Sequence, residues 1–220
     1  MPGRSRESAK GINMAEIVRI HPDNPQESAL EKAVKVLEEG GLIVYPTDTV
    51  YSFGCDLRQP KALERLARIK GLKVEKADFS IVFHDLSQLS QYTRQVDTPT
   101  YKMLKRCLPG AYTFILSANA EVPRLFKSKK KTIGIRIPDH SIPRALAQKL
   151  GSPLVASSVH DEDEILEYTT DPELIAEKYG KQVDLVVDGG MGNQYASTVV
   201  DLSGPEMRIL REGKGAVDLL

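Results

Sequence analysis

The 220-residue sequence contains few cysteines and no long apolar run. Two cysteines, Cys55 and Cys107, are too few for a disulfide framework or a four-cysteine zinc site. We expect them to be the reduced thiols of an intracellular protein. No stretch of about 18 apolar residues predicts a transmembrane helix, and no apolar segment predicts secretion. These absences predict a cytoplasmic protein with no membrane partner.

Several common catalytic motifs are also missing. The sequence has no Ser-His-Asp order, no His-Glu-x-x-His motif and no Cys-x-x-Cys motif. The glycine-rich segment Asp188–Asn193 has neither Walker nor Rossmann spacing, so it predicts a turn without a phosphate-binding role. No linker or internal repeat divides the chain. Residues 1–14 are expected to be a disordered tail, and residues 15–220 a single domain.

Charge is unevenly distributed along the neutral chain. Residues 101–150 contain eleven Lys or Arg and two acidic residues, whereas residues 151–190 contain ten acidic residues and two lysines. The first segment suggests a positive surface for a polyanion, next to an acidic, solvated segment. The alternative is that the opposite charges meet in the folded protein.

Short apolar runs alternate with helical patterns from residue 15 onward, which predicts an α/β domain with a large, twisted and mostly buried sheet. The expected strands are Glu16–Ile20, Leu42–Tyr45, Phe79–Phe83, Tyr112–Leu116, Thr132–Ile137, Leu154–Ser158, Leu185–Val187, Thr198–Leu202 and Met207–Leu210. The expected helices are Gln26–Glu39, Pro60–Lys70, Thr98–Leu108, Ile142–Leu150 and Pro172–Tyr179.

Two hydroxyl side chains follow the second expected strand. Thr47 and Thr49 lie two residues apart, so an extended backbone would direct both hydroxyls to the same side. Loops at the carboxyl ends of strands bind ligands in open α/β folds. The pair therefore suggests a site for a small polar ligand, whereas a simple capped turn is the structural alternative.

Two arginines occupy unusual positions. Arg136 lies within an apolar strand, and Arg211 follows another. A buried guanidinium requires a partner, so each arginine either pairs with a carboxylate or faces an anion such as phosphate.

Two further segments carry charge or hydroxyls. Ser157, Ser158 and His160 end a strand and precede four acidic residues, which suggests either a cation site or, more simply, a solvated acidic loop. A compact basic loop contains Lys127, Lys129, Lys130 and Lys131. It suggests contact with a nucleic-acid backbone, and a simply solvated loop is the alternative.

Several motifs occur in an order that resembles the YrdC/YciO family of threonylcarbamoyl-AMP synthases and their paralogues. They are Tyr45–Tyr51 (YPTDTVY), Leu108–Gly110 (LPG), Gly134–Asp139 (GIRIPD), Ser197–Asp201 (STVVD) and Leu210–Gly213 (LREG). The resemblance runs from about residue 16 to the C-terminus. Details such as His21–Pro25, Lys131–Gly134 and Gln182–Leu185 are most similar to the YciO branch.

The resemblance implies a twisted mixed sheet flanked by helices around a concave, positively charged cavity. It also implies binding of ATP or AMP, and of double-stranded RNA or tRNA. Synthases of this family combine threonine, bicarbonate and ATP into threonylcarbamoyl-AMP and pyrophosphate for tRNA modification. Mg²⁺ is the expected companion of ATP, and no metal ligands of the protein itself are predicted.

The family's functional residues map onto matching positions of this chain. By resemblance, Thr47 and Thr49 contact threonine, and Ser197, Thr198 and Arg211 bind the nucleotide. The implied catalytic residues are Lys70, Arg136 and Ser158.

Two positions depart from the family pattern. Leu72 replaces the arginine of a Lys-x-Arg motif, and His160 replaces the asparagine of a Ser-x-Asn motif. Lys73 or Lys76 could supply the missing positive charge, but a lysine lacks the bidentate geometry of arginine. The alternative is therefore a non-catalytic RNA-binding module that has lost synthase activity.

Overall fold

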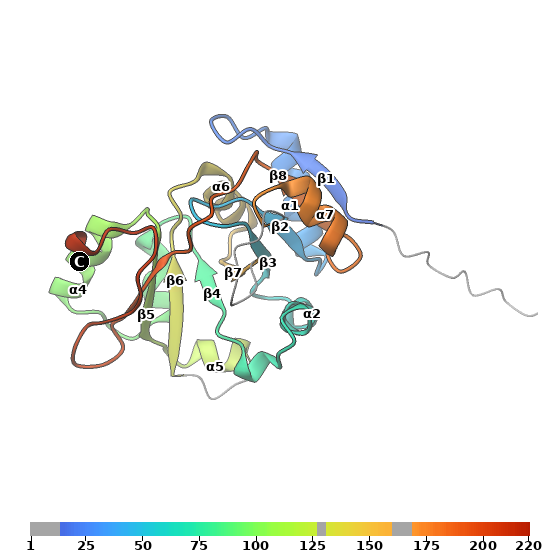
Figure 1. The fold of residues 1–220 in the computed structure, drawn as a ribbon. Coiled ribbons are helices and arrows are strands. Elements are labelled where there is room, and N and C mark those ends of the chain that lie inside the picture. Colours follow the sequence, from blue (N-terminus) through green and yellow to red (C-terminus); the bar gives the residue numbers. More distant parts are fainter. Residues whose placement is uncertain (1–13, 127–130, 160–168) are drawn as a thin grey trace, which may run out of the picture.

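A ten-stranded mixed sheet organises the protein. The computed structural model describes residues 14–126, 131–159 and 169–220 (Figure 1). In spatial order the strands are β1 (Glu16–Arg19), β8 (Leu185–Asp188), β2 (Ile43–Tyr45), β3 (Ser52–Asp56), β7 (Leu154–Ser158), β4 (Ser80–Val82), β6 (Thr132–Arg136), β5 (Tyr112–Ser117), β9 (Thr198–Asp201) and β10 (Arg208–Arg211). The expected single α/β domain is confirmed.

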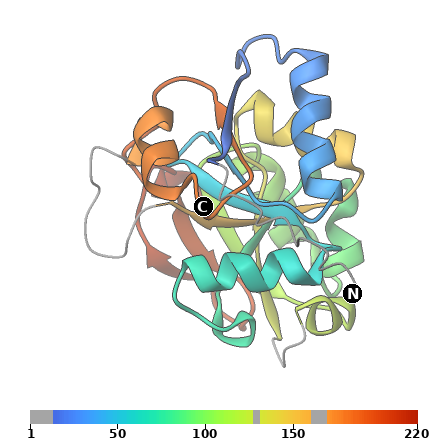
Figure 2. The same ribbon diagram turned by 90° about the vertical axis from the view of Figure 1, so that its right-hand side faces the viewer.

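Helices cover both faces of this sheet (Figures 1 and 2). They are α1 (Glu27–Glu38), α2 (Pro60–Ile69), α3 (Leu89–Tyr92), α4 (Thr98–Cys107), α5 (Glu121–Leu125), α6 (Ser141–Leu150) and α7 (Pro172–Tyr179). Apolar residues of α1 and α6 join one buried cluster, and those of α2, α4 and α7 join another. No helix within the described ranges has the length and apolarity to cross a membrane.

Local sequence signals explain where several helices begin and end. Asp171 caps α7 by accepting a hydrogen bond from the Glu173 amide, with Pro172 in the first turn. Asp97 caps α4 in the same way. Gly151 ends α6 in the left-handed conformation, at φ 67°. These signals place the expected helices to within one or two residues.

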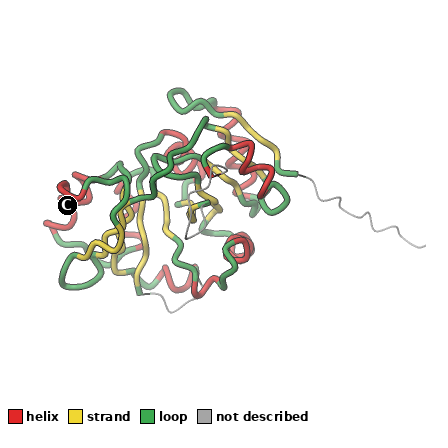
Figure 3. Tube along the Cα trace, in the orientation of Figure 1, coloured by secondary structure: helices red, strands yellow, loops and turns green. Residues whose placement is uncertain are grey.

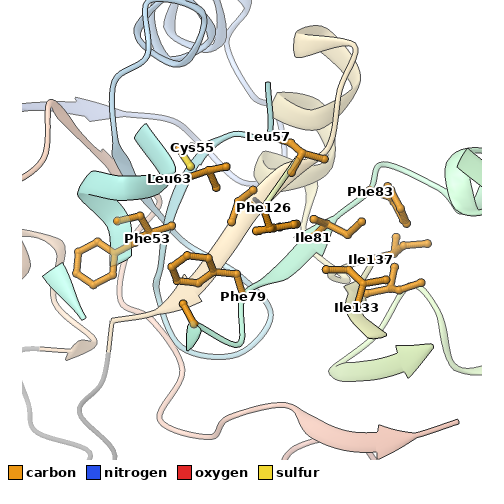
Figure 4. Packing of buried hydrophobic residues seen from close by; sticks show 14 of the residues in the cluster. Phe53, Cys55, Leu57, Leu63, Phe79, Ile81, Phe83, Phe126, Ile133 and Ile137 are labelled. Carbon is orange, nitrogen blue, oxygen red and sulfur yellow. The ribbon is translucent and has the colours of Figure 1, made fainter. Parts of the chain in front are cut away.

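The larger core lies on the face covered by α2 (Figure 4). The rings of Phe53, Phe83 and Phe126 are almost fully buried there, and Phe53 makes an edge-to-face contact with Tyr179 of α7 at 5.0 Å. Burying each such side chain contributes about 1.5–3 kcal/mol. The opposite face carries the second cluster, in which α1 and α6 pack on the sheet.

Strand β3 was not expected from the sequence, because Ser52–Asp56 contains no apolar run. The structure pairs it antiparallel with both β2 and β7, and buries every residue. The list of expected strands therefore lacks one strand, which lies directly after the threonine pair. The expected strand Met207–Leu210 lies one residue later, so Arg211 belongs to β10. Figure 3 shows the strands in yellow, with helices in red around them.

Candidate functional site: a polar cavity on the sheet

Small side chains on neighbouring strands leave a hollow on one face of the sheet. Ala156 of β7 pairs with Ser80 of β4, and Ser80 pairs with Gly134 of β6. A Cβ atom added at Gly134 would lie 3.3 Å from the side chains of Ser80 and Thr113. Helices α1 and α6 lie over a different part of the same face. The row of small residues therefore forms the floor of a cavity.

The cavity has a volume of about 460 Å³, within the usual range for a small-molecule site. Its lining is rich in hydroxyls and holds both signs of charge. Lining residues are Ser52, Lys70, Asp78, Phe79, Ser80, Thr113, Ile115, Thr132, Ile133, Gly134, Arg136, Ala156, Ser157, Ser158, Ser197, Val199 and Arg211. Several candidate residues from the sequence are among them, although they come from distant parts of the chain: Lys70, Arg136, Ser158, Ser197 and Arg211.

Arg136 pairs with a carboxylate, as one of its two alternatives predicts, and it also lines the cavity. Its role toward an anion stays a prediction. Its Nη2 atom lies 2.9 Å from Oδ1 of Asp48 and 2.9 Å from Oγ1 of Thr49. The side chain is 5% exposed. Its Nε atom is buried and has no hydrogen-bond partner in the described parts of the chain. The guanidinium therefore retains a donor for a further acceptor.

The Thr47 and Thr49 hydroxyls are together, as expected, with their Oγ1 atoms 2.9 Å apart. The expected cause was wrong. The Thr49 amide donates to Oγ1 of Thr47, and this hydroxyl donates to the Val50 carbonyl, so a hydroxyl-stabilised turn brings them together. The turn expected as the structural alternative is therefore present. Both threonines are buried, and neither is among the residues that line the cavity, so their contact with threonine stays a prediction.

Arg211 contacts the cavity from β10. It donates to the Ser197 carbonyl at 3.0 Å and 3.1 Å and to the Ser197 hydroxyl at 3.3 Å. The Ser197 hydroxyl also bonds to the Thr113 hydroxyl at 2.8 Å. Burial lowers the pKa of Arg211, and the like charge of Arg136 lowers it further. No carboxylate of the described chain pairs with Arg211, and these two guanidiniums therefore form an anion-attracting pair.

Thr198 points elsewhere. Its hydroxyl donates to the Gly215 carbonyl at 2.6 Å and accepts from the Gly213 amide at 3.0 Å. The side chain is fully buried and does not line the cavity. In the structure Thr198 fastens the C-terminal segment, and its nucleotide-binding role stays a prediction.

Lys70 and Ser158 lie at another side of the cavity. Nζ of Lys70 donates to the Ser158 carbonyl at 3.3 Å. Leu72, which replaces the family arginine, is 46% exposed and does not line the cavity. Asp78 does line it. Among the described residues that line this side of the cavity, Lys70 contributes an ammonium and Asp78 a carboxylate.

Sequence reasoning missed the supporting residues Asp48, Asp78 and Lys214. Asp48 pairs with Arg136 and also accepts from the Asp139 amide, at 3.0 Å. Nζ of Lys214 donates to the Asp48 carbonyl at 2.6 Å, which ties the C-terminal segment to the threonine turn. Only the position of Asp48 between two threonines was a usable signal, since the other contacts arise from tertiary packing.

Other expected features fall partly outside the described residues. The residues outside the described ranges include Lys127, Lys129, Lys130, His160 and the four acidic residues that follow His160. Lys131 is described and exposed at the start of β6. Within the described ranges, no three His, Cys, Asp or Glu side chains gather as a metal site.

The structure is therefore an α/β fold with a polar cavity that two arginines line. A model of the Sua5/YciO/YrdC family, described as "Telomere recombination", matches residues 35–213. The chain therefore belongs to this family, and the family expected from its motifs is confirmed.

The curated relatives fall into two groups. An uncharacterized protein of Haemophilus influenzae is 44% identical over 92% of this chain and 98% of its own length. Uncharacterized protein YciO of Escherichia coli is 42% identical over 93% and 98%. A threonylcarbamoyl-AMP synthase of Coxiella burnetii is 28% identical over 78% and 91%.

Solved structures agree with this grouping. The crystal structure of E. coli YciO has a TM-score of 0.85 and 40% identity, and covers 94% of this chain and 99% of that chain. P. abyssi Sua5 complexed with L-threonine has a TM-score of 0.80 and 26% identity, covering 90% and 57%.

Proposed function

We propose that this protein binds an adenine nucleotide in the cavity and makes threonylcarbamoyl-AMP, for modification of tRNA. In this reaction the amino group of threonine and bicarbonate give a carbamate and water. A carbamate oxygen then attacks the α-phosphate of ATP and displaces pyrophosphate. The observation that carries the proposal is the convergence of Arg136 and Arg211 on one hydroxyl-rich cavity. Relatives named threonylcarbamoyl-AMP synthase and a Sua5 structure with L-threonine support it.

The proposed roles combine the contacts of Arg136, Arg211 and Ser197 with the family resemblance for the threonines, which do not line the cavity. Arg136 and Arg211 hold phosphate oxygens, because charge-assisted hydrogen bonds from two forks stabilise a developing anion. Ser197 orients Arg211, and Thr198 is assigned to the nucleotide site only by resemblance. Thr47 and Thr49 hold the threonine, next to the Arg136–Asp48 pair.

Lys70 and Ser158 are proposed to act on the leaving pyrophosphate at the other side of the cavity. Mg²⁺ would arrive with the phosphates of ATP, since the described residues offer no ready set of ligands. When bound, it would neutralise charge on pyrophosphate. Catalysis otherwise consists of positioning the carbamate against the α-phosphate.

The direct test is an end-point assay with ATP, Mg²⁺, threonine and bicarbonate, in which mass spectrometry follows threonylcarbamoyl-AMP. The matched variants are Arg211→Gln and Arg208→Gln. Both residues lie on β10, but Arg208 pairs with Asp201 and does not line the cavity. We expect threonine-dependent product with the wild type and Arg208→Gln, and at least a roughly tenfold loss with Arg211→Gln. Equal activity of the two variants would refute the assigned role.

A second candidate is a non-catalytic RNA-binding module. The observation that favours it is Leu72, whose exposed side chain lies outside the cavity where the family has an arginine. The basic residues Lys127, Lys129, Lys130 and Lys131 would then contact the backbone of double-stranded RNA or tRNA.

This candidate is tested by fluorescence anisotropy with tRNA over a range of salt concentrations. The triple variant Lys129→Ala, Lys130→Ala and Lys131→Ala would weaken binding and reduce the salt dependence, whereas Lys61→Ala on α2 would not. Arg211→Gln would leave RNA affinity unchanged. RNA binding that persists while the synthase assay yields no product would favour the module over the enzyme.

A further inference from the structure

The two arginines that line the cavity are held by distant parts of the sheet. Arg136 donates to the carboxylate of Asp48, in the turn after β2. Arg211 donates to the carbonyl of Ser197, directly before β9. Strands β3, β7, β4, β6 and β5 lie between β2 and β9. In a flat sheet these strand spacings, at about 4.8 Å each, would separate the two supports by roughly 29 Å. The sheet is curled, and one side chain links the two supports.

Lys214 is this link. Its amide donates to the Ala196 carbonyl at 2.8 Å, next to Ser197. Its Nζ atom donates to the Asp48 carbonyl at 2.6 Å, and the Asp48 carboxylate accepts from Arg136. A chain of hydrogen bonds therefore joins the support of one guanidinium to the support of the other through a single lysine.

The backbone on both sides of Lys214 is fixed independently of its side chain. The Gly213 amide donates to the Thr198 hydroxyl at 3.0 Å, and this hydroxyl donates to the Gly215 carbonyl at 2.6 Å. Thr198 is fully buried. The ammonium of Lys214 therefore extends from a fixed backbone, and its contact with the turn after β2 sets where that turn lies relative to β9.

We propose that Lys214 is a positioning residue, which sets the spacing of Arg136 and Arg211 and thereby the affinity of the cavity for ATP. This proposal rests on the ATP binding proposed above. Two guanidiniums bind a polyphosphate best when their donors are already placed to match its oxygens. Lys214 does not line the cavity, so it acts through the arginines. The Asn193 amide also holds the turn, at 3.2 Å from the Thr49 carbonyl, so we expect loss of the ammonium to shift the turn rather than unfold it.

The experiment is a double-mutant cycle in which calorimetry measures the affinity for ATP with Mg²⁺. The proteins are the wild type, Lys214→Met, Arg211→Gln and the double variant. Methionine keeps an apolar stem without the ammonium, and Lys214 is exposed, so the core stays intact. Two further variants are controls. Lys214→Arg still carries donors for the Asp48 carbonyl, and Lys102→Met replaces an exposed lysine of α4 that does not line the cavity.

We expect Lys214→Met to weaken ATP binding roughly tenfold in the wild-type background but less than about twofold beside Arg211→Gln, because no arginine pair then remains to be spaced. Lys214→Arg should restore most of the affinity, and Lys102→Met should leave it unchanged. Hydrogen exchange of the ligand-free protein gives a second measurement. The amides of Thr49 and Asp139, which donate to groups of the turn, should exchange faster in Lys214→Met, while the amides of the core strands do not change.

The opposite results are distinct. Equal losses of ATP affinity in both backgrounds, or no loss in either, would overturn the positioning role, since Lys214 would then act through its charge alone or not at all. Unchanged amide exchange at Thr49 and Asp139 would overturn it without any ligand. If ATP binds none of these proteins, the proposed function and the affinity that rests on it are overturned, whereas faster exchange in Lys214→Met would still support the link between the two supports.

Discussion

Arg136 and Asp48 form an ion pair whose side chains are only 5% and 7% exposed, with Nη2 2.9 Å from Oδ1. Asp48 extends from the turn after β2, and Arg136 from the end of β6. The pair therefore holds the turn that carries Thr47 and Thr49 against Arg136, and Asp48 offsets the positive charge that Arg136 brings to the cavity. We expect the stability of the turn to depend on this pair.

The first prediction concerns the stability of this pair. Asp48→Ala leaves the Arg136 guanidinium buried without its counter-charge, and should lower the free energy of unfolding by about 3–5 kcal/mol. Replacement of both residues, by Asp48→Leu with Arg136→Met, should cost less than the sum of the single variants Asp48→Leu and Arg136→Met. Urea denaturation measures all three, and additive losses would show that the two side chains are not coupled.

A second prediction concerns the floor of the cavity. Ser80→Val places a larger, β-branched side chain beside Gly134, in a strand that tolerates it. Nucleotide affinity should fall at least about tenfold, while the melting temperature stays within a few degrees of the wild-type value. Unchanged nucleotide affinity, measured by calorimetry on the folded variant, would place the ligand elsewhere.

The third prediction separates two roles for Thr198. Thr198→Val keeps the shape of the side chain but removes its hydrogen bonds to Gly213 and Gly215. We expect a loss of about 1–3 kcal/mol of unfolding free energy, together with faster amide exchange in residues 211–216. Nucleotide affinity of the folded variant should change less than it does in Arg211→Gln. An affinity loss without destabilisation would instead support the direct nucleotide contact implied by resemblance.

A fourth prediction concerns pH. His140 caps α6 through Nδ1, which accepts from the Ile142 amide and must therefore be unprotonated. Burial lowers the pKa of His140 below its ordinary 6.5, although the carboxylates of Asp48 and Asp139 act against this. Because the unfolded chain takes up the proton more readily, stability should fall as pH drops below about 6.5 toward the lowered pKa.

The matched control is His140→Asn, which keeps a capping acceptor without a titrating ring. Thermal melts between about pH 5 and 8 should show a shallower pH dependence for this variant than for the wild type. Parallel profiles of the two proteins would exclude His140 as a source of the pH dependence.

The fold was largely predictable because its signals are local. Apolar runs locate most strands, and the caps at Asp97, Asp171 and Gly151 locate the helix ends. β3 escaped prediction since Ser52 and Gly54 are small rather than apolar, and their burial follows from pairing with β2 and β7. The site was predictable where a charged residue interrupts an apolar segment, as Arg136 does in its strand.

Asp78 and Lys214 were not predictable, because nothing local distinguishes them from solvated surface charges. Asp78 lines the cavity because the chain enters β4 beside it, and Lys214 contacts Asp48 because the chain turns back after β10. The small-residue floor was likewise hidden, since Ala156, Ser80 and Gly134 become neighbours only when three distant strands pair.

The most direct test of the central claim is to locate a bound nucleotide by amide chemical shifts. AMP would be titrated into ¹⁵N-labelled protein, and the shifted amides assigned. We predict that the largest shifts cluster at Ser80, Gly134, Ser197 and Arg211, around the cavity, and that they disappear in Arg211→Gln but persist in Arg208→Gln. Shifts that gather on another surface, or no shifts at millimolar AMP, would contradict a nucleotide site in this cavity.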